Sequence, residues 1–384
     1  MITYLFMIRS LGVGLLKIVF AFSIVFPFSL NAFQYGAFSL KNNIGTFPNS
    51  SSKLHENEDR IFIHENLEGL KGYDLIAGVL DGHNGKEVVN FVSSSISRKF
   101  DEFFRSNDDF CEERFKELFQ NLEQEIENQK LNSGSTAIMA CIEHGNLWLI
   151  NLGDSRAIYC KEVENNSENK NEIFSTKDHV PDFGTEDFKR IISKGGSIII
   201  RYAITYGSPN KCFDLLREFT PLENNTFKEE FSNVCEFNGE PIFRKKSSPH
   251  NKIIKAIDNP RPMLSNFKVC SKDCRVLNVS EIRSLGMSRS FGDLKFKPLG
   301  VCAVPDVYSY VIQKNAKDFI VLASDGLWDV CDEKEVCNFV TSHRDLFNYN
   351  AQEICEALVK EAGSRYLQRK WEADDISVIV VFLD

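Results

Sequence analysis

Carboxylates that follow short apolar runs are the residues of this sequence with the clearest chemical potential. The run Leu75–Leu80 carries no charge and is followed at once by Asp81-Gly82-His83-Asn84-Gly85. A carboxylate at a rigid strand end can hold a divalent cation, and the carbonyl of the next glycine can be a second oxygen ligand. Such a turn alone is more often an ordinary turn. Acidic residues recur at similar places, however, and this favours a metal site: Glu58-Asp59, Asp154, Asp293, Asp325 and Asp374-Asp375.

The elements that must position these carboxylates alternate between strands and helices. Apolar residues recur at helical spacing in residues 87–104 and 111–130, which predicts two amphipathic helices. Further helices are expected at residues 185–194, 333–342 and 351–367, and strands at residues 33–41, 61–64, 75–80, 138–142, 147–152, 157–160, 319–323 and 378–382, with a polar linker at 161–171. Hairpins separated by helix pairs predict an α+β fold, in which antiparallel sheets pack together and helices lie outside.

The amino-acid composition and net charge limit the classes of function that this chain can have. The chain has 384 residues, 43% of them hydrophobic, which is enough for a sizeable core. A net charge of -9 without a Lys/Arg stripe argues against a nucleic-acid surface. The 11 cysteines are scattered and odd in number, so we expect packed, reduced thiols rather than a disulfide framework or a zinc ribbon.

Residues 1–32 differ from the rest of the chain. Arg9 and Lys17 flank apolar residues, and residues 18–30 carry no charge. We predict a signal peptide or a membrane anchor, although the run is shorter than the roughly 20 residues that span a bilayer. The secretory pathway or a membrane-associated location follows from that reading. An apolar N-terminal extension on a cytoplasmic protein is the alternative.

Residues 202–274 show weak periodicity and contain six prolines. We predict an insertion in a domain that otherwise runs from residue 33 to residue 384. It either selects substrates or a partner, or is a tolerated surface addition, because long loops cost little to close.

Eight motifs in a fixed order resemble the metal-dependent protein phosphatases of the PPM (type 2C) family. The motifs are Glu58-Asp59-Arg60, Asp81-Gly82-His83-Asn84-Gly85, Ser133-Gly134-Ser135-Thr136-Ala137, Asn151-Leu152-Gly153-Asp154-Ser155-Arg156, Asp178-His179-x-Pro181, Ser288-Arg289-Ser290-Phe291-Gly292-Asp293, Ser324-Asp325-Gly326-Leu327-Trp328-Asp329 and Asp374-Asp375-Ile376-Ser377. The resemblance implies a four-layer α/β/β/α sandwich, a centre of two magnesium or manganese ions, and hydrolysis of phosphoserine and phosphothreonine in phosphorylated protein substrates. A monomer is expected.

The resemblance also implies roles for single residues. Asp81 is expected to bridge both metals and the Gly82 carbonyl to bind the first, whereas Asp293, Asp325 and Asp374 would complete the shell of the second. Glu58 and Asp59 would hold metal-bound waters, Asp154 would belong to a weaker third metal site, and His83 falls where the family has its general acid.

Hydrolysis of a phosphate monoester needs the functions that these carboxylates and His83 could supply. Two cations can generate a hydroxide nucleophile near neutral pH, bridging the ions, and can neutralise phosphoryl charge. Ligands that are all oxygen favour magnesium or manganese over zinc. Because a serine alkoxide is a poor leaving group, an imidazolium at His83 could protonate it near neutral pH. The alternative for His83 is a hydrogen bond within its own turn.

Three positions depart from the family pattern. Leu54 stands where the family has a phosphate-binding arginine, and the adjacent Lys53 could supply only a point charge. Asp374-Asp375 replaces the usual Asp-Asn pair, and Lys295 stands where many members have an acid. These departures keep a second function open, that of a catalytically weak pseudophosphatase acting as a regulatory binding module.

Overall fold

The computed structural model describes residues 33–41, 56–66, 72–104, 110–165, 168–206, 212–221, 227–237, 240–245, 267–278, 283–312, 317–369 and 373–383. The expected targeting segment Met1–Ala32 lies outside these residues, as do Lys53 and Leu54. No helix in the described part of the chain is long and apolar enough to cross a membrane.

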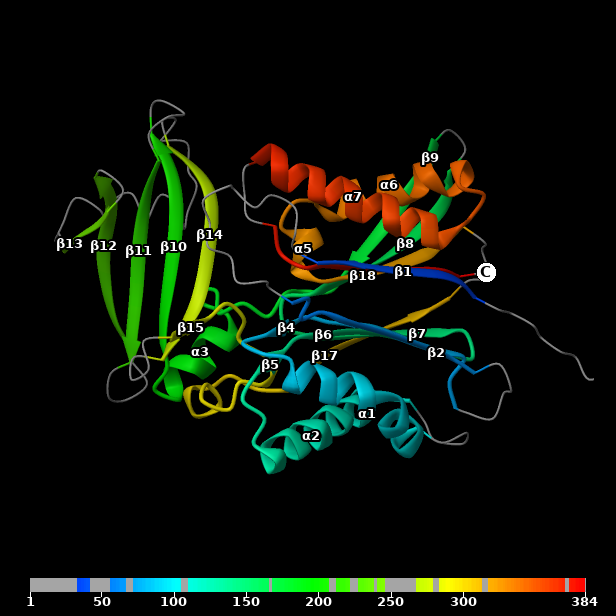
Figure 1. Ribbon diagram of the computed structural model, residues 1–384, viewed down its shortest axis with the longest axis horizontal. Helices are drawn as coiled ribbons and strands as arrows, with labels where there is room; N and C mark the ends of the chain where they lie inside the picture. The colour runs from blue at the N-terminus through cyan, green and yellow to red at the C-terminus, as the bar shows by residue number, and fades with distance from the viewer. Residues whose placement is uncertain are drawn as a thin grey trace, which may run out of the picture. The chain divides into compact units, whose positions relative to one another are not determined.

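Two five-stranded antiparallel sheets form the centre of the unit Phe33–Asp384 (Figure 1). One has the order β1-β19-β18-β8-β9, with bounds Gln34–Leu40, Ile376–Phe382, Phe319–Ala323, Arg156–Asn165 and Glu168–Ser175. The other has the order β17-β7-β6-β3-β2, with bounds Asp306–Val311, Asn146–Leu152, Ala137–Glu143, Leu75–Leu80 and Arg60–Glu65.

The two sheets pack face to face because their central strands are apolar on both sides. Leu75, Ala77 and Val79 of β3 share one buried cluster with residues of β18 and β19. The alternate β3 residues, Ile76 and Leu80, face the other way, into a cluster with the helices. A strand buried on both faces reads as a continuous apolar run rather than an alternating one.

A helix pair covers the outer face of each sheet (Figure 1). Helices α1 (Glu87–Phe103) and α2 (Glu112–Gln129) pack on the β3-containing sheet, and α6 (Glu333–Leu346) and α7 (Ala351–Arg369) pack on the other. A capping box at Asp332 fixes the start of α6. The α+β fold, a four-layer α/β/β/α sandwich of two antiparallel sheets flanked by helices, is therefore confirmed.

The predicted polar linker at residues 161–171 is wrong. Residues 161–165 belong to β8 and residues 168–171 to β9, and Lys161 is paired with Glu172. Because β9 is an edge strand, charged residues are compatible with it, and they hide the apolar alternation that marks a strand.

The chain between α3 (Glu186–Ser193) and the site loop forms a sheet of its own. Its six strands have the order β13-β12-β11-β10-β14-β15, with bounds Glu240–Lys245, Phe227–Phe237, Cys212–Pro221, Ser197–Tyr206, Phe267–Asn278 and Arg283–Leu285. The predicted insertion at residues 202–274 falls within this sheet. Strands β10 and β14 pair from Ser197 and Leu277 onwards, so the sheet begins before the predicted boundary.

Candidate active site

A small three-stranded sheet brings the turn after β3 to the loop before residue 293. Its order is β16-β5-β4, with bounds Phe291–Gly292, Gly134–Ser135 and Gly82–His83. His83 and Gly292 are both paired with Gly134, which lies between them. A Cβ atom at Gly134 would collide with Nε2 of His83 and with Oδ2 of Asp293. Glycine at this position therefore lets the two side chains meet.

His83 and Asp293 form a hydrogen-bonded pair. Nε2 of His83 lies 2.7 Å from Oδ2 of Asp293, and the hydroxyl of Ser290 donates to the same oxygen at 2.6 Å. Burial lowers the pKa of His83, but the Asp293 carboxylate outweighs burial, so the pKa lies above 6.5. Burial tends to raise the pKa of Asp293, whereas His83 lowers it further, so this pKa is below 3.8. Both pKa shifts favour the charged forms, so they favour an ion pair between His83 and Asp293.

Asp81 is held at the end of β3 by the next strand. Its backbone N–H donates to Oγ1 of Thr136 at 3.2 Å, and its carbonyl accepts from the Thr136 N–H at 2.9 Å. The Thr136 hydroxyl is in turn 2.7 Å from the hydroxyl of Ser155. Asp81 and the segment containing Asp154 and Ser155 are thereby fixed to the same threonine.

The residues just before β2 lie against the residues just before β19. The Glu58 N–H donates to Oδ2 of Asp375 at 2.9 Å, and the Ser324 hydroxyl donates to Oδ2 of Asp59 at 3.0 Å. Oε1 of Glu58 accepts from the N–H of Gly85 at 3.1 Å, which ties the residues before β2 to the turn after Asp81. Asp374 is exposed, and its Oδ1 accepts from the Asp375 N–H at 2.8 Å.

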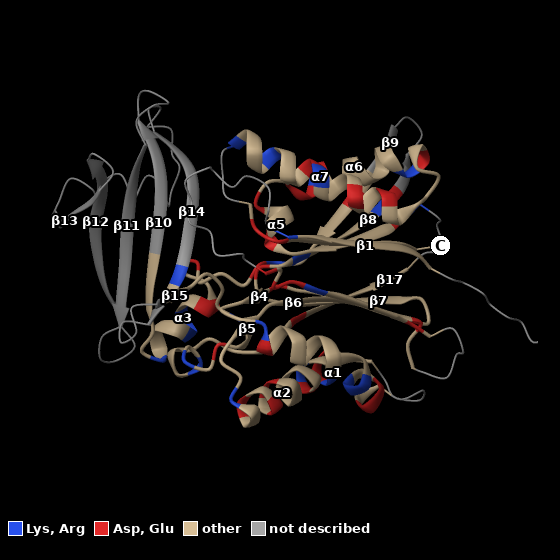
Figure 2. Ribbon diagram, in the orientation of Figure 1, with Lys and Arg blue, Asp and Glu red and all other residues tan. Residues whose placement is uncertain are grey.

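Several of these carboxylates, partly or fully buried, lie close enough together to oppose one another's ionisation. Burial, followed by the charge of Asp325, raises the pKa of Asp81 well above 3.8. Burial, followed by the charge of Asp154, likewise raises the pKa of Asp325 well above 3.8. The pKa of Asp59 is raised to about 7 and that of Asp154 to about 6, in each case mainly by burial. Figure 2 shows acidic residues gathered in the loops near β4 and α5 (Asp325–Trp328).

This donor set fits a hydrated magnesium or manganese ion. Oδ1 of Asp154 and Oδ1 of Asp325 are buried and have no hydrogen-bond partner among the described residues. Within those residues, no three His, Cys, Asp or Glu side chains form a ready-made metal cage. Magnesium keeps several waters and needs only one or two carboxylates, so oxygen ligands of this kind suit it better than zinc.

The predicted ligands thus fall into two groups. In the first group, the negative charges of four aspartates raise the pKa of Asp81: Asp325, Asp59, Asp154 and Asp374. Glu58 adjoins them through Gly85. Asp293 is hydrogen-bonded to His83.

Comparison with known proteins decides the family. The protein phosphatase 2C family model matches residues 45–205 and 266–368, well over half of the chain. This chain belongs to the protein phosphatase 2C family. It is 26% identical over 343 residues to probable protein phosphatase 2C 72 of Arabidopsis thaliana, covering 85% of this chain and 81% of that protein. It is 24% identical to protein phosphatase 1B of Rattus norvegicus, covering 82% of this chain and 63% of that protein.

A solved structure supports the fold of this phosphatase 2C family member. The crystal structure of serine-threonine phosphatase 2C from Toxoplasma gondii has a TM-score of 0.55 and 21% identity, and the match covers 92% of this chain and 95% of that one. The two stretches matched by the family model are separated by residues 206–265, which include strands β11, β12 and β13.

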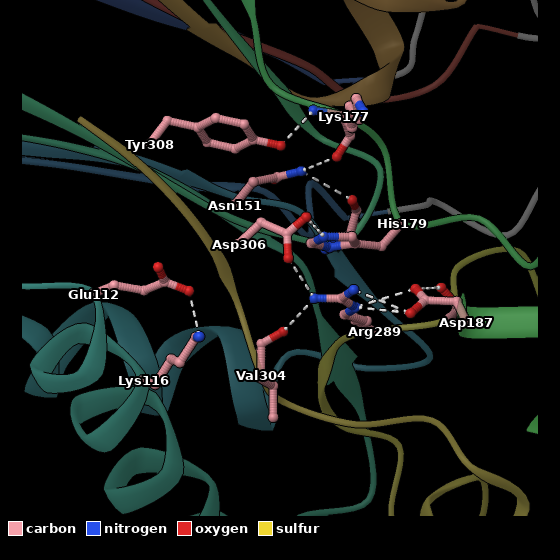
Figure 3. A network of polar contacts seen from close by, with 12 residues as sticks. Glu112, Lys116, Asn151, Lys177, His179, Asp187, Arg289, Val304, Asp306 and Tyr308 are labelled. Atoms are coloured by element: carbon pink, nitrogen blue, oxygen red, sulfur yellow. Dashed lines mark hydrogen bonds and ion pairs between the residues drawn. The ribbon is translucent and has the colours of Figure 1, made fainter. Parts of the chain in front are cut away.

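Sequence reasoning missed a polar network beside the site of this phosphatase 2C domain (Figure 3). Arg289 donates to both carboxylate oxygens of Asp187 at 3.0 to 3.2 Å and to Oδ1 of Asp306 at 2.7 Å. The Ser288 hydroxyl donates to Asp187 at 2.5 Å. Two motif residues are thereby anchored to α3. The motif Ser288-Arg289 was visible in the sequence, but nothing in the sequence marked Asp187 or Asp306 as its partners.

His179 joins this network to the carboxylate cluster. Its Nδ1 accepts from the N–H of Gly153 at 3.0 Å, and its Nε2 lies 3.1 Å from Oδ2 of Asp306. Its carbonyl accepts from the Ser288 N–H at 2.7 Å. The segment before Asp154 and the segment before Asp293 are therefore held by one histidine.

Proposed function

We propose that this protein phosphatase 2C family member is an active, magnesium- or manganese-dependent protein serine/threonine phosphatase with two ions in its site. The observation that carries the proposal is the His83–Asp293 pair beside the carboxylates of Asp154 and Asp325, each of which has a buried oxygen without a hydrogen-bond partner among the described residues. Phosphorylated proteins are its substrate class, as the names of its relatives indicate.

The carboxylates supply the binding sites. Asp81 and Asp325, with the Gly82 carbonyl and Asp374, would hold the two ions, and Glu58 and Asp59 would hold water around them. Asp154 is left for a weaker third site. The ions, when bound, lower the pKa of coordinated water and neutralise charge on the phosphoryl oxygens.

His83 supplies the proton that the leaving group needs. Its Nε2 is engaged by Asp293, so Nδ1, which is buried and has no partner among the described residues, is the atom left to donate. Asp293 orients the ring and favours its protonated form. This division of roles assigns Asp293 to His83 rather than to a metal. The role of Lys53 in binding substrate phosphate remains a prediction, since it lies outside the described residues.

A manganese titration with a phosphothreonine peptide tests the proposal. We expect activity to rise with manganese concentration and saturate, and Asp81→Asn to abolish it. A flat titration would instead support a regulatory binding module, the reading that Leu54 motivates. Circular dichroism of both proteins would establish that the loss is not due to unfolding.

A further inference from the structure

Strand β17 is an edge of its sheet within the part of the chain that the structure describes. The N–H of Ile312 donates to the Gly145 carbonyl at 2.8 Å, which continues the register of β17 with β7. Because hydrogen-bonded and non-hydrogen-bonded pairs alternate along an antiparallel ladder, the odd-numbered residues of β17 direct their N–H and C=O groups away from β7. These residues are Val307, Ser309 and Val311. The outer edge of β17 can therefore pair with a further strand.

The sequence of β17 lacks the features that usually prevent such pairing. Residues 307–312 contain no charged residue and no proline, whereas natural sheets commonly place charges and prolines on their edge strands. Ser309 is exposed, and Val311 is 73% exposed. An uncharged, exposed edge of this kind favours an incoming strand.

A cavity of about 470 Å³, here called the β17 cavity, adjoins this edge. It is lined by Phe110, Glu143, Asn146, Trp148, Ser309, Tyr310 and Val311. Phe110 and Trp148 pack against the cluster that contains α1 and α2, so the cavity lies on the helix-covered face of the sheet. Ligand pockets usually measure about 300 to 1,000 Å³, so this volume can accept a long side chain with its neighbouring backbone.

The lining of the β17 cavity suits a basic side chain. Among the described residues that line it, Glu143 is the one that carries a charge. Its carboxylate oxygens lie 3.0 Å from Nδ1 of His144 and 3.1 Å from Nδ2 of Asn146, and each can accept a further hydrogen bond. The rings of Phe110 and Trp148 can contact an alkyl stem and a cation. Nε1 of Trp148 is buried without an acceptor among the described residues, and a carbonyl oxygen of a bound segment would supply one.

We propose that the outer edge of β17 and the β17 cavity form a docking site for an extended segment of a partner protein, with a lysine or arginine side chain in the cavity. The main chain of the segment pairs with Ser309 and Val311, and its basic side chain meets Glu143. The inference goes beyond the proposed phosphatase function and does not depend on it. An exposed ion pair contributes up to about fivefold in an equilibrium constant, and an acidic side chain would be repelled, so we expect a preference of about three- to tenfold for Lys over Glu.

The peptide acetyl-Thr-Val-Thr-Lys-Thr-Val-Thr-amide tests this docking site, and the same peptide with Glu in place of Lys is the comparison. Lys and Val fall on one face of a strand, in the same order in either strand direction. The readout is the indole N–H signal of Trp148 in NMR spectra of the full chain, identified among the signals of its three tryptophans with Trp148→Phe. This signal should shift and saturate, with a Kd for the Lys peptide about three- to tenfold lower than for the Glu peptide.

Substitutions at two positions separate the main-chain pairing from the charge preference. Ser309→Pro removes an N–H on the outer edge, where proline is tolerated, and should raise the Kd of both peptides by about fivefold or more. Ser309→Thr keeps the N–H and is its control. Glu143→Gln should remove the preference for Lys, and Glu143→Lys should reverse it. Glu353→Lys, at an exposed position of α7 on the other sheet, changes the net charge as Glu143→Lys does and should leave the preference as it is.

Three results would overturn the docking site: a Trp148 signal that does not respond to about 1 mM of the Lys peptide, equal affinity of the unaltered protein for both peptides, or unchanged affinity after Ser309→Pro. Thermal unfolding of each variant shows whether it is folded. If Ser309→Pro is not, the order of the two peptides with Glu143→Lys decides the question.

Discussion

The imidazole of His83 meets the carboxylate of Asp293 at 2.7 Å, although 210 residues separate them in the chain. Gly134 lies between their strands and leaves the space that both side chains use. Asp293 is buried and His83 is partly buried, and each partner shifts the other's pKa toward the charged form. A histidine whose protonated form is favoured by a carboxylate partner is suited to donate a proton to a leaving group.

His83→Ala should lower kcat for a phosphoserine peptide by about 10² to 10⁴, the usual contribution of a general acid. The loss should be much smaller for p-nitrophenyl phosphate, because a nitrophenolate leaves without protonation. Steady-state rates on both substrates measure the difference. His144→Ala is the control, since its side chain is 71% exposed in a hairpin turn. Equal losses on the two substrates would contradict the proton-donor role.

Asp293→Asn separates two roles for this carboxylate. Because Asp293 is the hydrogen-bond partner of His83, removing its charge should lower kcat for the phosphoserine peptide by about tenfold or more. The manganese concentration for half-maximal activity should change by less than about twofold, since this carboxylate is bonded to His83 and Ser290. Manganese titrations of both proteins make the comparison. A large rise in the manganese requirement would place Asp293 among the ligands, as the family resemblance implies.

The sequence was sufficient to predict the layers of the fold because the central strands and the helices carry strong patterns. Leu75–Leu80 and Phe319–Ala323 are fully buried, and their lack of charge predicted this. The hairpin of β8 and β9 was missed because charged residues obscure the period of an edge strand. The strands of the sheet within residues 202–274 were not predicted, since prolines and weak periodicity gave no pattern there.

The position of a single site residue could be predicted from the sequence only where the strand next to it in the chain determines that position. Asp81 follows its strand directly, so its position could be inferred from the local pattern. The partner of His83 could not, because it depends on the two-residue strands β4, β5 and β16 pairing across the chain. The bond between Ser324 and Asp59 is equally long-range, since its partners are 265 positions apart in the sequence.

Asp325→Asn should raise the thermal stability of the metal-free protein at pH 7.5. Burial and neighbouring carboxylates raise the pKa of Asp325 well above 3.8, so its ionised form is costly in the folded state, and an uncharged isostere removes that cost. The same change should abolish stabilisation by manganese, which for the unaltered protein is about 2.7 kcal/mol at a concentration of 100 Kd.

Thermal unfolding with EDTA and with manganese tests both halves of this prediction. Asp345→Asn is the control, because this α6 residue has a side chain that is 78% exposed. It should alter neither measurement. A variant at Asp325 that manganese still stabilises would show that this carboxylate does not hold an ion.

Asp187→Asn should destabilise the protein by about 3 kcal/mol at pH 7, because it breaks a largely buried contact with Arg289. Burial tends to raise the pKa of Asp187, but hydrogen bonds from Arg289 and Ser288 outweigh it and hold the pKa below 3.8. A carboxyl group whose pKa is lower in the folded state stabilises that state above its unfolded pKa. This stabilisation is lost as the pH falls through the folded pKa.

The cost of Asp187→Asn should therefore be constant between about pH 7 and pH 5 and should shrink below about pH 4, where the carboxyl group of the unfolded chain becomes protonated. Urea denaturation with EDTA at pH 7, 5 and 3.5 measures it. Glu186→Gln is the matched control on the same helix, since its side chain is 85% exposed and its ion pair with Lys189 should contribute less than about 1 kcal/mol. A cost for Asp187→Asn that stays the same at pH 3.5 would mean that packing, rather than the charge of Asp187, holds Arg289 and α3 together.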